Sequence, residues 1–386
     1  AFMQYLRGGM VAVVVTKFGG TSVGSAESIR QVVEIVKASQ SRNPIVVVSA
    51  LSGVTDMLLA SARKALDRSF SAKETDKAVQ DRHTAVIGEL GLQADIISEE
   101  LTELEHVLFG ISLIRELTPR TKDYVASFGE RLSSRIVAAY ARKAGLNAQP
   151  FNAYDLGVIT DGSFGNAEIL PGTYQAIAAA VKSIPAGVIP IVTGFIGKTG
   201  QGEVTTLGRG GSDYSAAIFG AALNAEEIEV WTDVDGVMTA DPRIVSNART
   251  VGAVSFEEAS ELAYFGAKVL HPKAILPALN KNIPVRVLNT FNPLGKGTLI
   301  LKNVTRKEHV TAITSKSNIY VININSARML LAYGFLHHVF KLFDEFRIPV
   351  DMIATSEVNV TVTVEDKLDI SGLVGKLREF AAVAVL

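Results

Sequence analysis

Four short apolar runs rich in valine and isoleucine most constrain the fold of this chain. They lie at 11–16, 44–49, 188–193 and 227–232, and segments with helical spacing separate them. A strand that is apolar on both faces is typical of a parallel sheet covered by helices on each side, because a sheet with one wet face would alternate. We therefore predict an α/β protein, a three-layer sandwich around a mostly parallel central sheet.

Further segments complete this large domain. In residues 71–142, charged and apolar side chains recur at helical spacing, which predicts a helical insertion on one side of the sheet. Additional strands are expected at 147–151, 285–288 and 298–301, and the turn-forming residues 292–297 join the last two.

A smaller domain is predicted after a polar linker at 302–309. The strict alternation of Val358 to Val364 indicates a sheet with one wet face, and therefore a small α+β domain. The expected order is strand, helix, strand, strand, helix and strand, at 319–324, 334–346, 350–353, 358–364, 370–380 and 381–386. The predicted domains are 10–302 and 308–386, and the second is expected to be incomplete because the chain stops on an apolar strand.

Composition excludes several classes of protein. With 38 basic and 39 acidic residues the net charge is −1, so neither a nucleic acid nor an anionic membrane is favoured as a partner over a small molecule. The chain has no cysteine, which excludes disulfides and thiolate metal sites and fits a reducing compartment. No apolar run approaches the roughly 18 residues needed to span a bilayer. We expect a soluble, cytoplasmic protein.

The residues from Lys17 to Val23 read KFGGTSV, between the first apolar run and a helical segment. Glycines at a strand-to-helix turn let the backbone approach an anion, the helix N-terminus supplies N–H groups, and Lys17 adds a full positive charge. The pattern predicts a phosphate site; the alternative is that the small residues serve only tight packing.

A second glycine-rich loop, TLGRGGSD at 206–213, precedes a helix expected at 214–223. Arg209 lies among three glycines, and a guanidinium on such a loop suits bidentate recognition of a carboxylate or phosphate. In the alternative interpretation, Ser212 and Asp213 only cap the helix.

Three further segments offer charged groups. WTDVDG at 231–236, with DPR at 241–243, follows a strand and could bind Mg²⁺, ribose or phosphate, although aspartates beside glycine and proline also form ordinary turns. Glu130 is predicted just before a helix, where it could bind a substrate ammonium or only favour the helix dipole. Lys268 offers a second cation or a solvated surface group.

Taken in order, these segments resemble the aspartate kinases of the amino acid kinase superfamily. The resemblance rests on KFGGTSV at 17–23, SFGER at 127–131, TTLGRGGSD at 205–213, WTDVDGV at 231–237 and ELAYFGAKVLHP at 261–272. RMLL at 328–331, GFL at 334–336 and VDMIATSEV at 350–358 are similar to the first ACT regulatory module of that family. Such kinases usually carry a second ACT module, inserted before the closing strand of the first, and this chain departs from that pattern.

The resemblance implies transfer of the γ-phosphoryl group of ATP to the β-carboxylate of L-aspartate. The product, 4-phospho-L-aspartate, begins lysine, methionine and threonine biosynthesis. Mg²⁺ is expected to bridge the phosphates, with few direct protein ligands. A carboxylate with an unperturbed pKa of about 3.9 is already ionised at neutral pH, so the reaction needs positioning and charge neutralisation, not a protein nucleophile or general base.

The resemblance also assigns residues. The nucleotide site would comprise Lys17, Gly19, Gly20, Thr232, Asp233, Arg243 and Lys268, with both lysines on the β- and γ-phosphates. The aspartate site would comprise Thr55, Glu130, Arg209 and Ser212, with Arg209 on the α-carboxylate and Glu130 on the ammonium. Asp213 would orient Lys17 and Arg209, and the catalytic set would be Lys17, Arg209, Asp213 and Lys268.

Regulation is expected in the small domain. The resemblance implies a pocket for an amino-acid effector, lysine or threonine, around Met329, Phe335, Leu336, Val350 and Asp351, with Asp351 on the effector's ammonium. Exposed strand edges favour a homo-oligomer. The alternatives are another amino acid kinase acting on glutamate, N-acetylglutamate or UMP, a non-catalytic amino-acid sensor, and a kinase fused to homoserine dehydrogenase.

Overall fold

The computed structural model describes residues 13–67, 72–264, 270, 272–305, 310–329 and 333–386. They belong to two compact units, Ala1–Thr314 and Ser315–Leu386. The division between the units follows the linker that the sequence predicts at 302–309. No helix in the described ranges combines the length and the apolar character that crossing a membrane requires.

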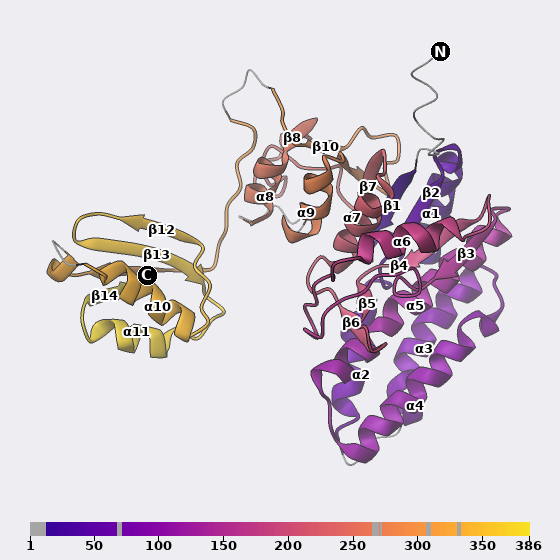
Figure 1. Ribbon diagram of the computed structural model, residues 1–386, viewed down its shortest axis with the longest axis horizontal. Coiled ribbons are helices and arrows are strands. Elements are labelled where there is room, and N and C mark those ends of the chain that lie inside the picture. Colours follow the sequence, from indigo (N-terminus) through magenta and orange to yellow (C-terminus); the bar gives the residue numbers. More distant parts are fainter. Residues whose placement is uncertain (1–12, 68–71, 265–269, 271, 306–309, 330–332) are drawn as a thin grey trace. The chain divides into compact units, whose positions relative to one another are not determined.

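An eight-stranded sheet forms the centre of the first unit, in the order β3-β4-β2-β1-β7-β9-β10-β8 (Figure 1). In that order the strands are Ala148–Phe151, Ile189–Thr193, Pro44–Val48, Val14–Phe18, Glu227–Thr232, Val285–Asn289, Thr298–Leu301 and Ala253–Ser255. Neighbours pair in parallel except β9 and β10, which are antiparallel because a short turn joins them. The mostly parallel sheet is confirmed, and β8 is a strand that the sequence pattern did not indicate.

Helices cover both faces of this sheet, which confirms the three-layer prediction. One face packs on α1 (Ala26–Ala38), α2 (Val54–Lys64), α3 (Ala72–Glu89), α4 (Ser98–Ile114) and α5 (Pro119–Lys143), and the other on α6 (Thr173–Lys182), α7 (Gly211–Leu223), α8 (Phe256–Tyr264) and α9 (Pro272–Lys281). Val46 and Val48 of β2 belong to the first core, whereas Ile45 and Val47 belong to the second. Successive residues thus enter opposite cores, which is why the strand is apolar throughout.

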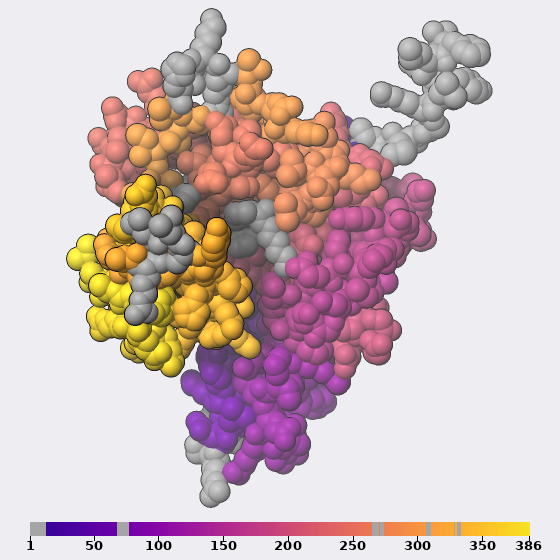
Figure 2. All heavy atoms as spheres, turned by 60° about the vertical axis from the view of Figure 1, so that its left-hand side comes forward, coloured from indigo at the N-terminus to yellow at the C-terminus, as the bar shows by residue number. Residues whose placement is uncertain are grey.

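The ends of the first unit come from different parts of the chain. Figure 2 shows the purple segment from α2 to α4 at one end and the salmon-to-orange segment from β8 to β10 at the other. Of the helices at the purple end, α3 and α4 belong to the helical insertion predicted at 71–142, whereas α2 precedes it; α5 completes the insertion. In its last helix, α5, the side chain of Thr118 caps the N-terminus by accepting a hydrogen bond from the Thr121 N–H at 3.2 Å, and Pro119 occupies the first turn.

One detail of the helical prediction is wrong. Glu130 does not precede a helix but lies in the middle of α5, which has 25 residues. Gly129, beside it, lowers helix propensity, yet a Cβ there would lie 2.7 Å from the Cβ of Ala50. Glycine at this position therefore allows α5 to pack closely against Ala50, and it does not mark the start of a helix.

The second unit has a four-stranded antiparallel sheet in the order β12-β13-β11-β14. Along the chain its elements are β11 (Ile319–Asn325), α10 (Phe335–Glu345), β12 (Met352–Thr355), β13 (Asn359–Glu365), α11 (Ser371–Arg378) and β14 (Ala382–Val385), which confirms the predicted order. Val360, Val362 and Val364 of β13 are fully buried, and the residues between them are only partly buried. Only β12 departs clearly, since it begins two residues after the predicted start.

Candidate active site

The two glycine-rich loops meet at the carboxyl ends of the central strands. Lys17 lies near the end of β1 and Asp213 in the first turn of α7, and the Nζ of Lys17 is 2.5 Å from Oδ1 of Asp213. Only 10% and 14% of these side chains are exposed. The predicted association of these two residues is therefore present as a nearly buried ion pair, which fixes the ammonium beside the first loop.

The first loop is anchored to β7 and to the residue that follows β9. The Gly19 N–H donates to the carbonyl of Trp231 at 3.1 Å, and the Ser22 hydroxyl shares a hydrogen bond of 2.7 Å with that of Thr290. The N–H of Gly20 has no backbone acceptor among the described residues, so it is the better placed of the two predicted donors. A Cβ at Gly20 would lie only 3.0 Å from the carbonyl oxygen of Ala50, which explains the glycine.

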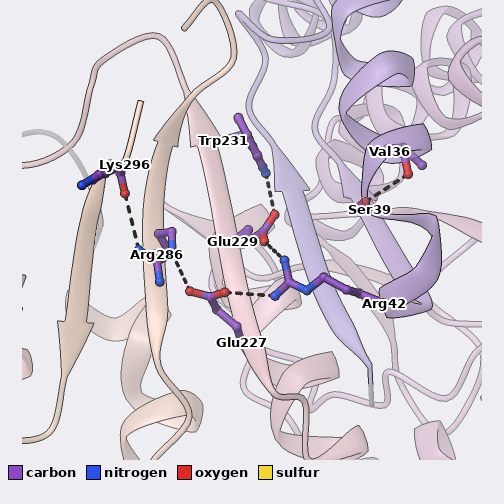
Figure 3. A network of polar contacts seen from close by, with 8 residues as sticks. All are labelled: Val36, Ser39, Arg42, Glu227, Glu229, Trp231, Arg286 and Lys296. Carbon is purple, nitrogen blue, oxygen red and sulfur yellow. Dashed lines mark hydrogen bonds and ion pairs between the residues drawn. The ribbon is translucent and has the colours of Figure 1, made fainter. Parts of the chain in front are cut away.

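Polar side chains of β7 form a network with neighbouring elements (Figure 3). Arg42, in the 3-10 helix η1 (Gln40–Arg42), contacts Glu229 at 2.5 Å and Glu227 at 3.0 Å. The indole N–H of Trp231 donates to the same Glu229 carboxylate at 3.0 Å, and the indole stacks on Phe18 with ring centres 6.0 Å apart. The network thus fixes the residue whose carbonyl anchors Gly19, and no sequence motif revealed it.

Glu130 supplies a buried carboxylate on the other side of the site. One oxygen, Oε1, accepts the Ala50 N–H at 3.1 Å, and the other, Oε2, has no hydrogen-bond partner among the described residues. Burial raises the pKa of Glu130 to about 8. Thr55 lies close by, since a Cβ on Gly129 would be 3.7 Å from the Thr55 hydroxyl. An unpartnered oxygen in such a setting is suited to receive a cationic group.

The second glycine-rich loop, residues 206–213, is called the arginine loop below, and its conformation depends on its glycines. Gly208 and Gly210 have φ angles of 77° and 71°, a left-handed conformation that favours glycine. Gly210 is the N-cap of α7, so Ser212 and Asp213 lie inside the first turn and the alternative that they cap the helix is wrong. Arg209 is exposed and forms no ion pair with any residue that the structure describes. Its guanidinium is therefore available to an anion.

Asp123 is a residue near this loop that sequence reasoning missed. Its Oδ2 accepts the N–H groups of Thr206 at 2.7 Å and Gly165 at 2.8 Å, and its Oδ1 accepts the Thr206 hydroxyl at 3.0 Å. Burial raises the pKa of Asp123, although these hydrogen bonds oppose the shift. The partners are 42 and 83 residues away in the chain, and no local signal connects them.

The structure does not bring together the remaining described residues that were predicted for the nucleotide site. The Thr232 hydroxyl donates to Asp233 at 3.2 Å at the end of β7, and Asp233 is exposed. Arg243 is 87% exposed and pairs with Asp241 at 2.7 Å, and this contact lowers the pKa of Asp241. Lys268 lies outside the described residues. Within the described part of the chain, no group of three or more potential ligand side chains is placed to hold a metal.

The predicted effector residues surround the core of the second unit. Met329, Phe335 and Val350 pack against that core, and Leu336 is 39% exposed. The Asp351 carboxylate is nearly buried, and the Nζ of Lys316 lies 2.8 Å from its Oδ2. The carboxylate predicted to bind an effector's ammonium thus already binds an ammonium of the same chain.

Comparison with known proteins identifies the family. Residues 12–289 match the sequence profile of the amino acid kinase family. The chain is 44% identical to the Arabidopsis thaliana protein aspartokinase 1, chloroplastic, over 91% of its own length, and spans 63% of that relative. It is 36% identical to the Escherichia coli lysine-sensitive aspartokinase 3, covering 92% of this chain and 79% of the relative.

Solved structures agree with this assignment. The crystal structure of E. coli aspartokinase III in complex with aspartate and ADP superimposes with a TM-score of 0.78 at 34% identity, over 97% of this chain and 85% of that one. The same enzyme in complex with lysine and aspartate gives a TM-score of 0.80 with the same coverage. The chain therefore belongs to the amino acid kinase family and, within it, to the aspartokinases.

Proposed function

We propose that this chain is an aspartate kinase, which transfers the γ-phosphoryl group of ATP to the β-carboxylate of L-aspartate. The observation that carries the proposal is the Lys17–Asp213 ion pair, which joins the two glycine-rich loops at the carboxyl end of the sheet. Open α/β sheets bind ligands at this edge. The E. coli relative was solved with aspartate and ADP, the acceptor and the nucleotide product of this reaction.

In the proposed reaction, a β-carboxylate oxygen of aspartate attacks the γ-phosphorus. The new P–O bond forms as the bond to the β,γ-bridging oxygen breaks, and ADP leaves with that electron pair. Lys17 neutralises charge on the transferred group, and the free N–H of Gly20 donates to a phosphate oxygen. We assign Thr232, Asp233, Arg243 and, from the sequence alone, Lys268 to the rest of the nucleotide site. No described residue has to accept a proton.

We propose that Mg²⁺ accompanies the nucleotide. The described residues offer no cluster of three ligands, and the nearest carboxylate to Lys17, that of Asp213, is already paired with it. This donor set fits an ion held mainly by phosphate oxygens and water, with few protein ligands. When bound, the ion would supply charge neutralisation on the β- and γ-phosphates.

The acceptor is held at both ends of its backbone. Arg209 takes the α-carboxylate in a charge-assisted bidentate pair, and the unpartnered Oε2 of Glu130 takes the ammonium. Thr55 and Ser212 complete the site. The α-ammonium supplies the cation that the buried Glu130 lacks, so binding of aspartate would favour its ionised form.

We further propose that an amino acid regulates the enzyme through the second unit. Lysine is the leading candidate because the E. coli relative is named lysine-sensitive and was solved with lysine, and threonine is the alternative. The proposed pocket comprises Met329, Phe335, Leu336, Val350 and Asp351. The proposed boundaries are 10–302 for the catalytic domain and 308–386 for the regulatory domain.

A product assay tests the function directly. Purified protein with ATP, Mg²⁺ and L-aspartate should release ADP and form an acyl phosphate that hydroxylamine traps as a hydroxamate. Glutamate, N-acetylglutamate and UMP should give no such release at equal concentration. Aspartate-independent ADP release, or a preference for any of the three others, would overturn the proposal.

A further inference from the structure

Asp123 joins two segments that are far apart in the chain. It lies on α5, is only 4% exposed, and accepts the N–H of Thr206 on β6 (Val204–Thr206) and that of Gly165 in the loop before α6. The N–H of Ala167 in turn donates to the Thr206 carbonyl at 2.9 Å. A single carboxylate thus fixes the point at which both segments contact α5.

The arginine loop begins at that point. Thr206 is followed by Leu207, Gly208 and Arg209, and a Cβ on Gly208 would lie 2.6 Å from the side-chain oxygen of Asn166. The loop is therefore packed against the segment that Asp123 holds through Gly165. Arg209 forms no ion pair with the described residues. The orientation of its side chain therefore depends on the conformation of the loop backbone.

Glu130 lies on the same helix, seven residues after Asp123. Seven residues are almost two full turns, so both side chains leave α5 from nearly the same face. We propose that Asp123 is a positioning residue for the acceptor amino acid: it sets the separation between the guanidinium of Arg209 and the carboxylate of Glu130. This inference rests on the proposed function.

The chemistry of the ligand makes that separation critical. The ammonium and carboxylate of an α-amino acid are attached to one carbon, so two groups that bind them must be held at a short and fixed distance. Arg209 belongs to a loop with left-handed glycines, whereas Glu130 belongs to a helix interior. Because Asp123 connects the helix directly to the loop, aspartate binding does not have to order the loop. The entropy cost of that ordering is therefore avoided.

The test compares Asp123→Ala with Asp123→Asn. The alanine variant leaves the buried N–H of Thr206 and the partly buried N–H of Gly165 without their acceptor. We expect the KM for aspartate to rise about 10- to 100-fold, with the KM for ATP within about threefold. Asparagine can accept both N–H groups through its oxygen and donate to the Thr206 hydroxyl, so it should restore the aspartate KM. Failure of asparagine to do so would overturn a role based on hydrogen-bond geometry.

Arg135→Met is a matched control on the same helix. Arg135 pairs with the buried Glu100 at 2.5 Å, away from the arginine loop, so its loss should lower stability without a selective change in the aspartate KM. Equal increases in both KM values in Asp123→Ala, as from general loosening, would refute the proposal. If the alanine variant does not fold, Thr206→Val carries the test, because it removes only the hydroxyl bond and should raise the aspartate KM more modestly.

Hydrogen exchange gives a readout that does not depend on activity. In Asp123→Ala the amides of 163–167 and 205–209 should exchange at least about tenfold faster, whereas those of α5 should not. Unchanged exchange in these segments would show that Asp123 does not hold the loop. Absence of aspartate-dependent ADP release by the wild-type chain would instead reject the proposed function. Hydrogen exchange would still test whether Asp123 holds the loop in that case.

Discussion

At the scale of single residues, Glu130 combines a proposed binding role with a cost in stability. In the folded protein the pKa of this group is about 8, above its ordinary value of 4.5. Between these values the unfolded chain has lost a proton that the folded chain retains, so the free energy of unfolding falls as the pH rises through this window. Removing the charge should therefore stabilise the fold at alkaline pH.

Glu130→Gln tests this directly. The Tm difference between variant and wild type should grow in favour of glutamine from pH 6 to pH 9, by at least about 3 °C. The same change should raise the aspartate KM, because glutamine cannot pair with an ammonium. Thermal melts at four pH values suffice, and a Tm difference that does not vary with pH would show that Glu130 is not buried in its neutral form.

Arg209→Ala should affect the acceptor selectively. Loss of a charge-assisted bidentate pair is worth roughly 1.5 to 3 kcal/mol, or about 10- to 150-fold in kcat/KM for aspartate. Because Arg209 is exposed and forms no ion pair among the described residues, the fold should be unaffected. Steady-state kinetics with each substrate varied in turn will decide, and an unchanged aspartate KM would remove Arg209 from the site.

Lys17→Ala should instead slow the chemical step. Its charge matters most as negative charge develops on the phosphoryl group, so we expect kcat to fall at least about 100-fold with modest changes in KM. Lys17→Arg, which keeps the charge beside Asp213, is the control and should retain more activity. A variant with normal kcat and a raised ATP KM would make Lys17 a ground-state anchor only.

At the scale of elements, a polar network runs along β7 from Glu227 to Trp231 (Figure 3). It connects the N-terminal end of this strand to the first loop. Glu229 is 5% exposed and receives both the Arg42 guanidinium and the Trp231 indole N–H. The Trp231 carbonyl anchors Gly19. A buried network of this kind specifies one arrangement of its members when each is satisfied.

Glu229→Ala should loosen that arrangement. It leaves the Trp231 indole without its acceptor and the Arg42 guanidinium with Glu227 alone. We expect a stability loss of about 2 to 4 kcal/mol and a changed emission maximum from Trp231, which is the only tryptophan in the chain. Glu229→Gln keeps an acceptor for the indole and should preserve the emission maximum. Denaturant melts followed by fluorescence measure both quantities, and identical spectra for the two variants would contradict the link.

At the scale of the whole molecule, assembly is predicted from an unprotected edge. Strand β12 ends its sheet, and all four of its residues are exposed, with Ile353 at 51%. Unpaired edges of this kind associate unless charge blocks them. We therefore expect light scattering to show a homo-oligomer at micromolar concentration.

A lysine on that edge should weaken the association. Ile353→Lys should shift the protein toward monomer, whereas Ile313→Lys, at another exposed isoleucine outside this sheet, should not. A wild-type monomer, or equal behaviour of the two variants, would rule out assembly through β12.

The sequence by itself determined the layered α/β fold, the small α+β unit and the two glycine-rich loops. These features depend on local patterns, since continuous apolar runs, strict alternation and glycines at a turn act within a few residues. The link between Lys17 and Asp213 was expected only through a resemblance, which implied that Asp213 orients Lys17 and Arg209, because these residues are distant from Lys17 in the chain. The prediction misplaced Glu130, which lies inside α5 and not just before a helix.

Only the tertiary structure decided the long-range contacts. Asp123 with Thr206 and Glu229 with Arg42 join residues that are 83 and 187 positions apart, and neither carboxylate belongs to a recognisable motif. The pKa of Glu130 likewise depends on its burial, which no local pattern encodes. The physical reason is that propensity and periodicity act between neighbours, whereas burial and hydrogen-bond partners are set by which elements the fold packs together.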